Sequence, residues 1–170
     1  MTLQLYLVRH AKAGFADTDI EDFERALTDR GRRDAVRMAR EAARLTTQTQ
    51  PTLLSSPAVR AITTARRFAE ALDVAPRAIR IDARLYEASA GDWMQVLGEQ
   101  LDATSPLLAF GHNPGISELG GWLCADIRNV SLPTAGLLGL ELAIPDWSEI
   151  DRDCAHRPLL RTPQDFAPDA

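Results

Sequence analysis

The sequence has few of the residue types that many functional sites require. It contains two cysteines, one lysine and three histidines among 170 residues. Two cysteines are too few for a disulfide framework, and a formal net charge of -5 argues against general nucleic-acid binding. No apolar run approaches the length of a membrane span, and no signal peptide precedes the first apolar segment. We therefore expect a cytoplasmic protein that binds neither membranes nor nucleic acids.

Two common hydrolase motifs are also missing. The chain has no glycine-rich loop ending in lysine that would cradle a nucleotide, and no G-x-S-x-G segment that would expose a nucleophilic serine. The only lysine is Lys12, so almost every cation is an arginine, which binds phosphate or carboxylate oxygens in pairs. The length fits one domain, which we assign to residues 1–157, and we expect the proline-containing residues 158–170 to form an irregular tail.

The first apolar run of the chain, residues 3–8, ends abruptly in Arg9 and His10. Such a run predicts a strand that is buried on both faces, as in a parallel sheet. His10 would then lie at the carboxyl edge of the sheet, where open α/β sheets bind ligands. Taken alone, the same residues are equally compatible with an ordinary polar turn.

The rest of the chain alternates between short apolar segments and segments of helical periodicity. This alternation predicts a three-layer α/β/α sandwich with a mainly parallel central sheet. Thr28, Ser56 and Asn113 are candidate N-caps, and the last two each precede a proline that suits a first helical turn. The predicted strands are 3–8, 52–55, 78–85, 106–110 and 134–144, and the predicted helices are 29–45, 57–72, 92–101 and 115–124.

Two histidines and two arginines are predicted to converge at one edge of the sheet. His112 follows the strand at 106–110, just as His10 follows the first strand. Arg60 falls in the first turn of a helix, where the helix dipole disfavours a cation unless an anion is also present. With Arg9, these residues predict a pocket for a small polyanion. The third histidine, His156, lies in the stretch from residue 145 onward that shows little periodicity, and we assign it no role.

A metal site is the competing interpretation of the two histidines. Arginines beside the ligands would repel a cation, and no third carboxylate or cysteine ligand falls in step with them. We therefore expect neither a metal nor another cofactor.

Three motifs combine the residues singled out above. They are Leu7-Val8-Arg9-His10-Ala11, Ser55-Ser56-Pro57-x-x-Arg60-Ala61-x-x-Thr64-Ala65 and Gly111-His112-Asn113-Pro114. Each resembles a motif of the histidine phosphatase superfamily, which also contains the cofactor-dependent phosphoglycerate mutases, and they occur in the same order there. Ala11 stands where glycine is usual, and alanine is a common variant in the short SixA-type phosphohistidine phosphatases. The segment Arg25-Ala26-Leu27-Thr28-x-x-Gly31 also resembles that branch.

The resemblance implies a phosphoglycerate mutase-like fold and a phosphatase that works through a phosphohistidine intermediate. His10 would accept the phosphoryl group, while Arg9, Arg60 and His112 would hold its equatorial oxygens. His10 must present a neutral ring nitrogen, so we expect a hydrogen bond, to backbone, on its other nitrogen. The implied partner is a phosphorylated substrate, and in the SixA branch a protein that carries phosphohistidine.

Two further residues have alternative interpretations. Arg25 is a candidate substrate ligand, and it could equally form a surface ion pair with Asp22 or Asp29. Glu87 stands where larger family members keep a general acid, but SixA-type proteins often depart from that pattern. Its other interpretation is a solvated loop carboxylate.

Two other functions fit the same motifs. A mutase or a small-molecule phosphomonoesterase would use the same residues, but the short connections between the motifs favour an open site that could admit a protein surface. A catalytically silent phosphate-binding module is the alternative from outside the enzymes.

Overall fold

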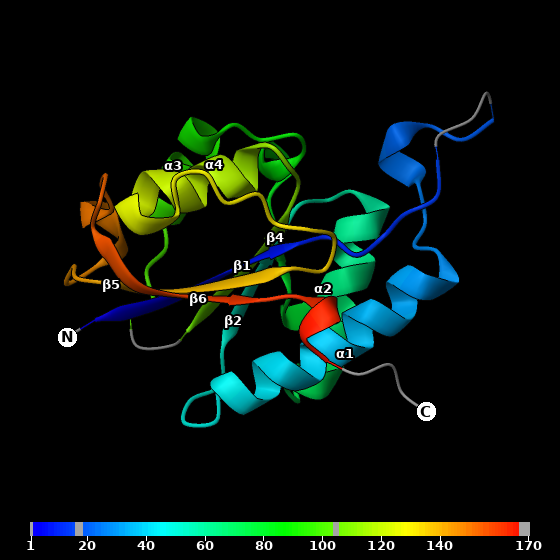
Figure 1. Cartoon of the computed structure of the whole chain (residues 1–170), viewed down its shortest axis with the longest axis horizontal. Coiled ribbons are helices and arrows are strands. Elements are labelled where there is room, and N and C mark those ends of the chain that lie inside the picture. Colours follow the sequence, from blue (N-terminus) through cyan, green and yellow to red (C-terminus); the bar gives the residue numbers. More distant parts are fainter. Residues whose placement is uncertain (1, 16–18, 104–105, 167–170) are drawn as a thin grey trace.

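A six-stranded sheet forms the middle layer of the structure (Figure 1). The computed structural model describes residues 2–15, 19–103 and 106–166. The strand order is β3-β2-β4-β1-β5-β6, with parallel pairing from β3 to β1 and antiparallel pairing of β5 with both neighbours. The sheet is therefore mixed but mostly parallel. Its strands are β1 (Leu3–Arg9), β2 (Thr52–Ser55), β3 (Arg80–Ile81), β4 (Leu107–Gly111), β5 (Leu137–Leu142) and β6 (Ala155–Arg161).

Helices cover both faces of this sheet, so the predicted three-layer sandwich is confirmed. Helices α1 (Asp29–Leu45) and α2 (Val59–Ala71) pack together on one face, and α3 (Ala90–Gly98) and α4 (Gly115–Leu123) pack together on the other (Figure 1). None of the described helices is long and apolar enough to cross a membrane. The short 3-10 helices are η1 (Asp22–Glu24), η2 (Pro76–Ala78), η3 (Ala83–Leu85), η4 (Ala125–Ile127), η5 (Trp147–Glu149) and η6 (Pro163–Asp165).

Strand β1 is buried on both faces, as its apolar run predicted. Leu5 and Leu7 join the core on the α3 and α4 face, which includes Trp93. Tyr6 and Val8 join the core on the α1 and α2 face. Because side chains alternate along a strand, one short run thus contributes to both cores.

The register of the sheet brings the two strand-end histidines to the same edge. Arg9 at the end of β1 pairs with Gly111 at the end of β4. The backbone amide of His10 then donates to the Gly111 carbonyl at 3.0 Å, so His10 and His112 follow neighbouring strand ends. This arrangement is the one expected from the sequence.

Several predicted elements differ at their ends from the observed ones, and for two of them the structure shows why. The strand expected at 78–85 is reduced to the two residues of β3, because η2 and η3 occupy the chain on either side. The Asp82 side chain caps η3 and so ends the strand. Helix α3 begins at Ala90, earlier than expected, because Ser89 and Asp92 form a capping box.

The irregular tail expected after residue 157 is also wrong for the described residues. Strand β6 pairs with β5 and carries His156, while Pro163 in η6 is buried. The pairing shifts register between Gly139 and Glu141, and Arg157 has a φ of 50°, so the strand lacks the regular alternation by which strands are recognised. The folded unit thus continues past residue 157, whereas residues 167–170 lie outside the described part.

Candidate active site

The backbone determines which ring nitrogen of His10 carries the proton. Nδ1 lies 2.8 Å from the carbonyl oxygen of Ala11, the kind of backbone contact expected from the sequence. A carbonyl oxygen can only accept, so Nδ1 is protonated and Nε2 of the neutral ring keeps its lone pair. The pKa of His10 is lowered to about 4, chiefly by burial and also by the charges of Arg60 and Arg9, although the Ala11 contact raises it. His10 is thus a neutral ring with a free nucleophilic nitrogen at pH 7.

His112 lies beside His10 in the same buried edge. The two ring centres are 5.3 Å apart, and only 5% of His112 is exposed. Its Nε2 is 2.7 Å from the hydroxyl oxygen of Ser56. The pKa of His112 is lowered to about 3, chiefly by burial and also by His10 and Arg60. His112 is therefore neutral as well.

The hydroxyl of Thr64 connects the first motif to the second. It accepts a hydrogen bond from the backbone amide of Ala11 at 3.0 Å and donates to the carbonyl of Arg60 at 2.8 Å. This contact holds the first turns of α2 against the end of β1. It explains why Arg60, although far from His10 in sequence, lies in the same site.

Three buried N–H or ring nitrogen atoms of the motif residues have no hydrogen-bond partner among the described residues. They are Nε of Arg9, Nε of Arg60 and Nδ1 of His112. Two further atoms of this kind, on Arg37 and Trp93, lie outside the motifs. An unpartnered buried polar group costs free energy, and donors of this kind suit the oxygens of an anion. These three atoms are therefore the candidate ligands for an oxyanion.

Asp22 joins three side chains of this site. Its Oδ2 accepts from Nη2 of Arg60 at 3.0 Å and from the Tyr86 hydroxyl at 2.6 Å, and its Oδ1 accepts from Nη1 of Arg25 at 2.8 Å. The hydrogen bond from Tyr86, followed by that from Arg25, holds the pKa of Asp22 well below its usual range. Asp22 is therefore ionised at neutral pH and has no proton to donate.

The structure decides between the two ion pairs considered for Arg25. Arg25 pairs with Asp22, and its Nε also donates to the Gly14 carbonyl at 2.5 Å. Asp29 instead pairs with Arg32 at 2.5 Å. Because Asp22 bridges both arginines, Arg25 belongs to the same cluster as Arg60.

Two N-caps expected from the sequence are wrong, and Ser56 has a different role. Helix α2 begins at Val59, and the Ser56 hydroxyl contacts His112 instead of capping a first turn. Helix α4 begins at Gly115, and the Asn113 side chain binds the Leu132 carbonyl at 2.9 Å instead of capping. The loop at Leu132 also accepts from Nη1 of Arg9 at 2.9 Å.

Tyr86 is a site residue that sequence reasoning missed. Its ring lies edge-on to His112 with centres 5.8 Å apart, and Phe23 packs edge-on against it at 5.2 Å. The neighbouring Glu87 has an exposed side chain, a φ of 50° and no side-chain hydrogen bond or ion pair among the described residues. Of these two neighbours, Tyr86 is therefore the one that contacts the motif residues.

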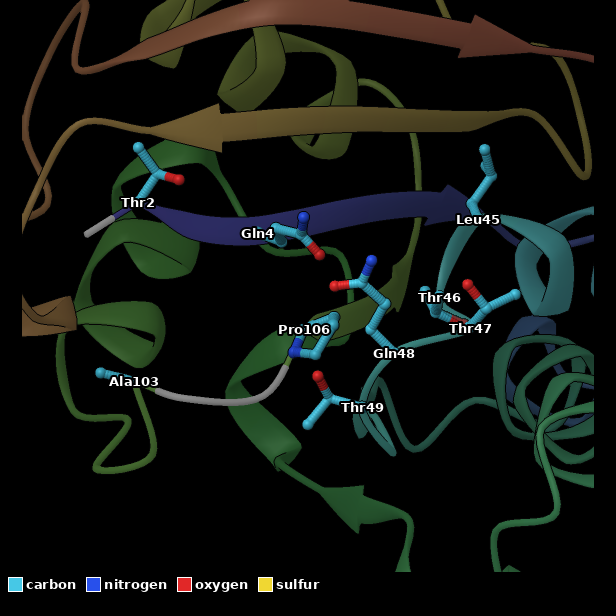
Figure 2. Close-up of a pocket in the computed structure, with 9 residues that line it drawn as sticks. All are labelled: Thr2, Gln4, Leu45, Thr46, Thr47, Gln48, Thr49, Ala103 and Pro106. Atoms are coloured by element: carbon cyan, nitrogen blue, oxygen red, sulfur yellow. The ribbon is translucent and has the colours of Figure 1, made fainter.

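The cavity shown in Figure 2 lies elsewhere. It measures about 320 Å³ and lies at the opposite edge of the sheet, where β1 and β4 begin. Its lining contains only uncharged polar and apolar side chains and none of the motif residues. The lining residues are Thr2, Gln4, Leu45, Thr46, Thr47, Gln48, Thr49, Ala103 and Pro106.

Comparison with known families decides the identity of this site. Residues 5–120 match the model of the histidine phosphatase superfamily (branch 1), more than half of the chain and all four motif residues. The chain belongs to the histidine phosphatase superfamily. It is accordingly a phosphatase, a hydrolase whose substrate is phosphorylated. No curated protein sequence matches the chain significantly.

Solved structures of other histidine phosphatases share the fold. A protein assigned as the phosphohistidine phosphatase SixA of Agrobacterium tumefaciens is 24% identical, with a TM-score of 0.73 over 98% of this chain and 99% of that chain. A SixA protein histidine phosphatase complexed with tungstate is 18% identical, with a TM-score of 0.74 over 96% and 99%. A mycobacterial glucosyl-3-phosphoglycerate phosphatase is 17% identical, with a TM-score of 0.61 over 95% and 98%. The predicted phosphoglycerate mutase-like fold is thus confirmed.

Among the described residues of this histidine phosphatase, no group of three His, Cys, Asp or Glu side chains is arranged to hold a metal ion. The cations in contact with the site are arginines. Arg9, Arg60 and Arg25 place positive charge at the site, where Arg60 and Arg25 share Asp22.

Proposed function

We propose that the chain removes the phosphoryl group from phosphohistidine on a protein. The observation that carries this proposal is the ionised state of Asp22, the carboxylate that contacts Arg60 and Arg25. It cannot protonate a leaving group, and the exposed Glu87 makes no side-chain hydrogen bond or ion pair within the described chain. A substrate whose leaving group needs no acid from the enzyme suits such a site best.

Phosphohistidine is a substrate of this kind. An alkyl phosphate must expel an alkoxide, which is a very poor leaving group unless an acid donates a proton. The conjugate acid of imidazole has a pKa of about 6.5, so a ring protonated on its free nitrogen takes the electrons of the P–N bond and departs neutral. The SixA structures, whose names include this activity, support the same choice.

In the proposed reaction, Nε2 of His10 attacks phosphorus as the P–N bond to the substrate imidazole breaks. Arg9, Arg60 and His112 hold the equatorial oxygens through the buried nitrogens that lack protein partners. Arg25, which forms an ion pair with Asp22, adds a positive charge beside the bound phosphoryl group. Water then attacks phosphorus, which releases His10 and inorganic phosphate.

The deciding experiment compares Glu87→Gln with the parent on a phosphohistidine protein and on an alkyl phosphate. We expect little change on phosphohistidine and, if Glu87 serves esters as an acid, a loss of roughly 100-fold on the alkyl phosphate. Single-turnover measurements ensure that chemistry limits both rates. Glu149→Gln, an exposed carboxylate on η5, is the matched control.

The two alternatives predict other outcomes. Equal large losses on both substrates would assign Glu87 as an obligatory acid and favour a small-molecule phosphomonoesterase, the kind of activity named for the mycobacterial neighbour. No turnover of any phosphorylated substrate by the parent would leave a phosphate-binding module. Chelators should have no effect, because arginines neutralise the phosphate.

His10→Ala tests the nucleophile directly. The variant should lose turnover while its circular dichroism spectrum stays that of the parent, because His10 follows β1 and is not among the large core side chains. Acid-labile, base-stable phosphate should form on the parent during turnover and be absent from the variant. If the variant still accumulates such phosphate, another residue is the acceptor.

A further inference from the structure

Ser56 belongs to the second motif, and the proposed function gives it no role. It follows β2, is 0% exposed, and its backbone amide donates to the Phe110 carbonyl of β4 at 3.0 Å. These contacts fix its position between β2 and the strand that leads into His112. Its hydroxyl oxygen lies 2.7 Å from Nε2 of His112.

The direction of this hydrogen bond follows from the other contacts of the two groups. The Ser56 hydroxyl also accepts from the backbone amide of Ala58 at 3.3 Å, and Nε2 of His112 is the one acceptor within reach of its hydrogen among the described residues. Because the hydroxyl is fully buried, donating to His112 avoids an unsatisfied hydrogen. A neutral imidazole has one donor nitrogen and one acceptor nitrogen. If Nε2 accepts from Ser56, then Nδ1 must carry the proton.

The location of that proton decides what His112 can bind. Nδ1 of His112 is buried without a hydrogen-bond partner in the described parts of the chain, and it lies in the ring that neighbours His10. A protonated Nδ1 donates to a phosphoryl oxygen, whereas the other tautomer would turn a lone pair toward an anion. His112 is neutral at pH 7, since burial lowers its pKa to about 3, so it depends on its tautomer rather than on a positive charge.

We propose that Ser56 is a positioning residue that holds His112 in the Nδ1-protonated tautomer, so that this buried nitrogen can donate to an oxyanion. The tautomers of the two histidines are then determined by different hydrogen-bond partners. The carbonyl of Ala11, which can only accept, leaves Nε2 of His10 as a nucleophile. The hydroxyl of Ser56, which can donate, leaves Nδ1 of His112 as a donor. The proposal rests on the proposed function only for the identity of the oxyanion as a phosphoryl group.

Nitrogen-15 NMR of the histidine rings tests the tautomer in the full-length protein without any turnover. Nδ1 of His112 should have the chemical shift and the bound proton of a pyrrole-type nitrogen, and Nε2 those of a pyridine-type nitrogen. His112→Gln assigns the signals. A pyrrole-type Nε2 of His112 in the parent would overturn the proposal, and the deciding spectrum is that of the parent protein.

Ser56→Ala should move His112 toward a mixture of tautomers and weaken binding of inorganic phosphate, measured by calorimetry, by about tenfold. Ser56→Thr keeps the hydroxyl and should restore both readouts. The control is Ser55→Ala, since Ser55 is equally buried but its hydroxyl donates to the Ser56 carbonyl rather than to a histidine. An unchanged tautomer in Ser56→Ala would overturn the proposal. Phosphate binding with the expected tautomer, but without phosphatase activity, would contradict the proposed function and leave the role of Ser56 standing.

Discussion

The two buried histidines make the stability of the protein depend on pH. Their pKa values in the folded chain are about 4 for His10 and about 3 for His112, below the ordinary value of 6.5. Between pH 6.5 and pH 4 the unfolded chain therefore binds more protons than the folded one. The stabilisation is fully present above pH 6.5 and is lost as the pH falls.

We therefore expect the free energy of unfolding to be lower at pH 4.5 than at pH 7, and His10→Gln to reduce this difference by up to about 3 kcal/mol. Urea unfolding at both pH values measures the effect. The control is His156→Gln, because His156 on β6 is only partly buried and lies outside the site. Parallel pH profiles for the parent and His10→Gln would contradict the burial of a neutral ring at position 10.

Asp22 sets the charge beside the oxyanion site. Asp22→Asn removes one negative charge and keeps one acceptor oxygen, so it can retain the hydrogen bond of Arg60 or that of Arg25 but not both. Calorimetry should then show inorganic phosphate binding several-fold more tightly at low ionic strength, with a difference that shrinks as salt screens the charge. Glu24→Gln makes the same charge change at an exposed position of the same 3-10 helix and should have little effect. Weaker phosphate binding in Asp22→Asn would mean that orienting the arginines outweighs the charge.

Sequence reasoning found the site residues that end a strand or begin a helix and missed those that reach the site across the fold. His10 and His112 follow apolar runs, so their shared edge could be predicted. The contacts of Asp22 with Arg60, of Tyr86 with Asp22 and of Ser56 with His112 join residues that are 38, 64 and 56 positions apart. No local pattern specifies such pairs, because they depend on how α2 and the loop before α3 pack against the sheet.

At the scale of elements, Gly31 marks where helix α1 approaches Lys12, the residue that follows the first motif. A Cβ on Gly31 in α1 would lie 2.1 Å from the carbonyl oxygen of Lys12, so the helix or the loop after His10 would have to move. Gly91 in α3 is different, since the nearest atom to its Cβ would be the Ser89 hydroxyl oxygen at 3.7 Å. Helix α1 can therefore lie against Lys12 only because residue 31 has no side chain.

These two glycines give a matched pair of substitutions. Gly31→Ala should destabilise the protein by about 1–3 kcal/mol or more, because the added atom overlaps backbone. Gly91→Ala should stabilise it by up to about 1 kcal/mol, since alanine favours a helix and meets no close neighbour. Urea unfolding gives both values. Equal effects of the two substitutions would contradict the close approach of α1 to Lys12.

Element types were easier to predict than element ends. The helices and the strands from β1 to β5 occur where the sequence pattern indicated them. A helix that buries one face has apolar residues at helical spacing, and a strand that is buried on both faces has an apolar run. The ends depend on individual side-chain contacts such as the Asp82 cap that shortens β3. Strand β6 was missed because its register shift and the positive φ of Arg157 interrupt the alternation that reveals a strand.

At the scale of the whole molecule, the end of the chain completes the sheet beside the site. Strand β6 pairs with the outer edge of β5, and β5 pairs with β1, the strand that His10 follows. Beyond residue 157, Arg161 forms an ion pair with Glu41 of α1 at 3.4 Å, and Phe166 packs against the core on that face. These contacts join the last described residues to α1 and to the core beneath it.

Removing residues 158–170 should therefore damage the fold. The truncation takes away the partners of Leu137, Leu138 and Gly139 in β5 and leaves an exposed strand edge of the kind that aggregates. A loss of several kcal/mol corresponds to a fall in Tm of roughly 10 °C in a chain of this size. We expect the truncated chain to melt lower by about that amount or to be recovered as aggregate, and to have lost turnover with its sheet. If it instead melts with the parent and retains turnover, β6 contributes little, and residues 1–157 are sufficient for the histidine phosphatase fold.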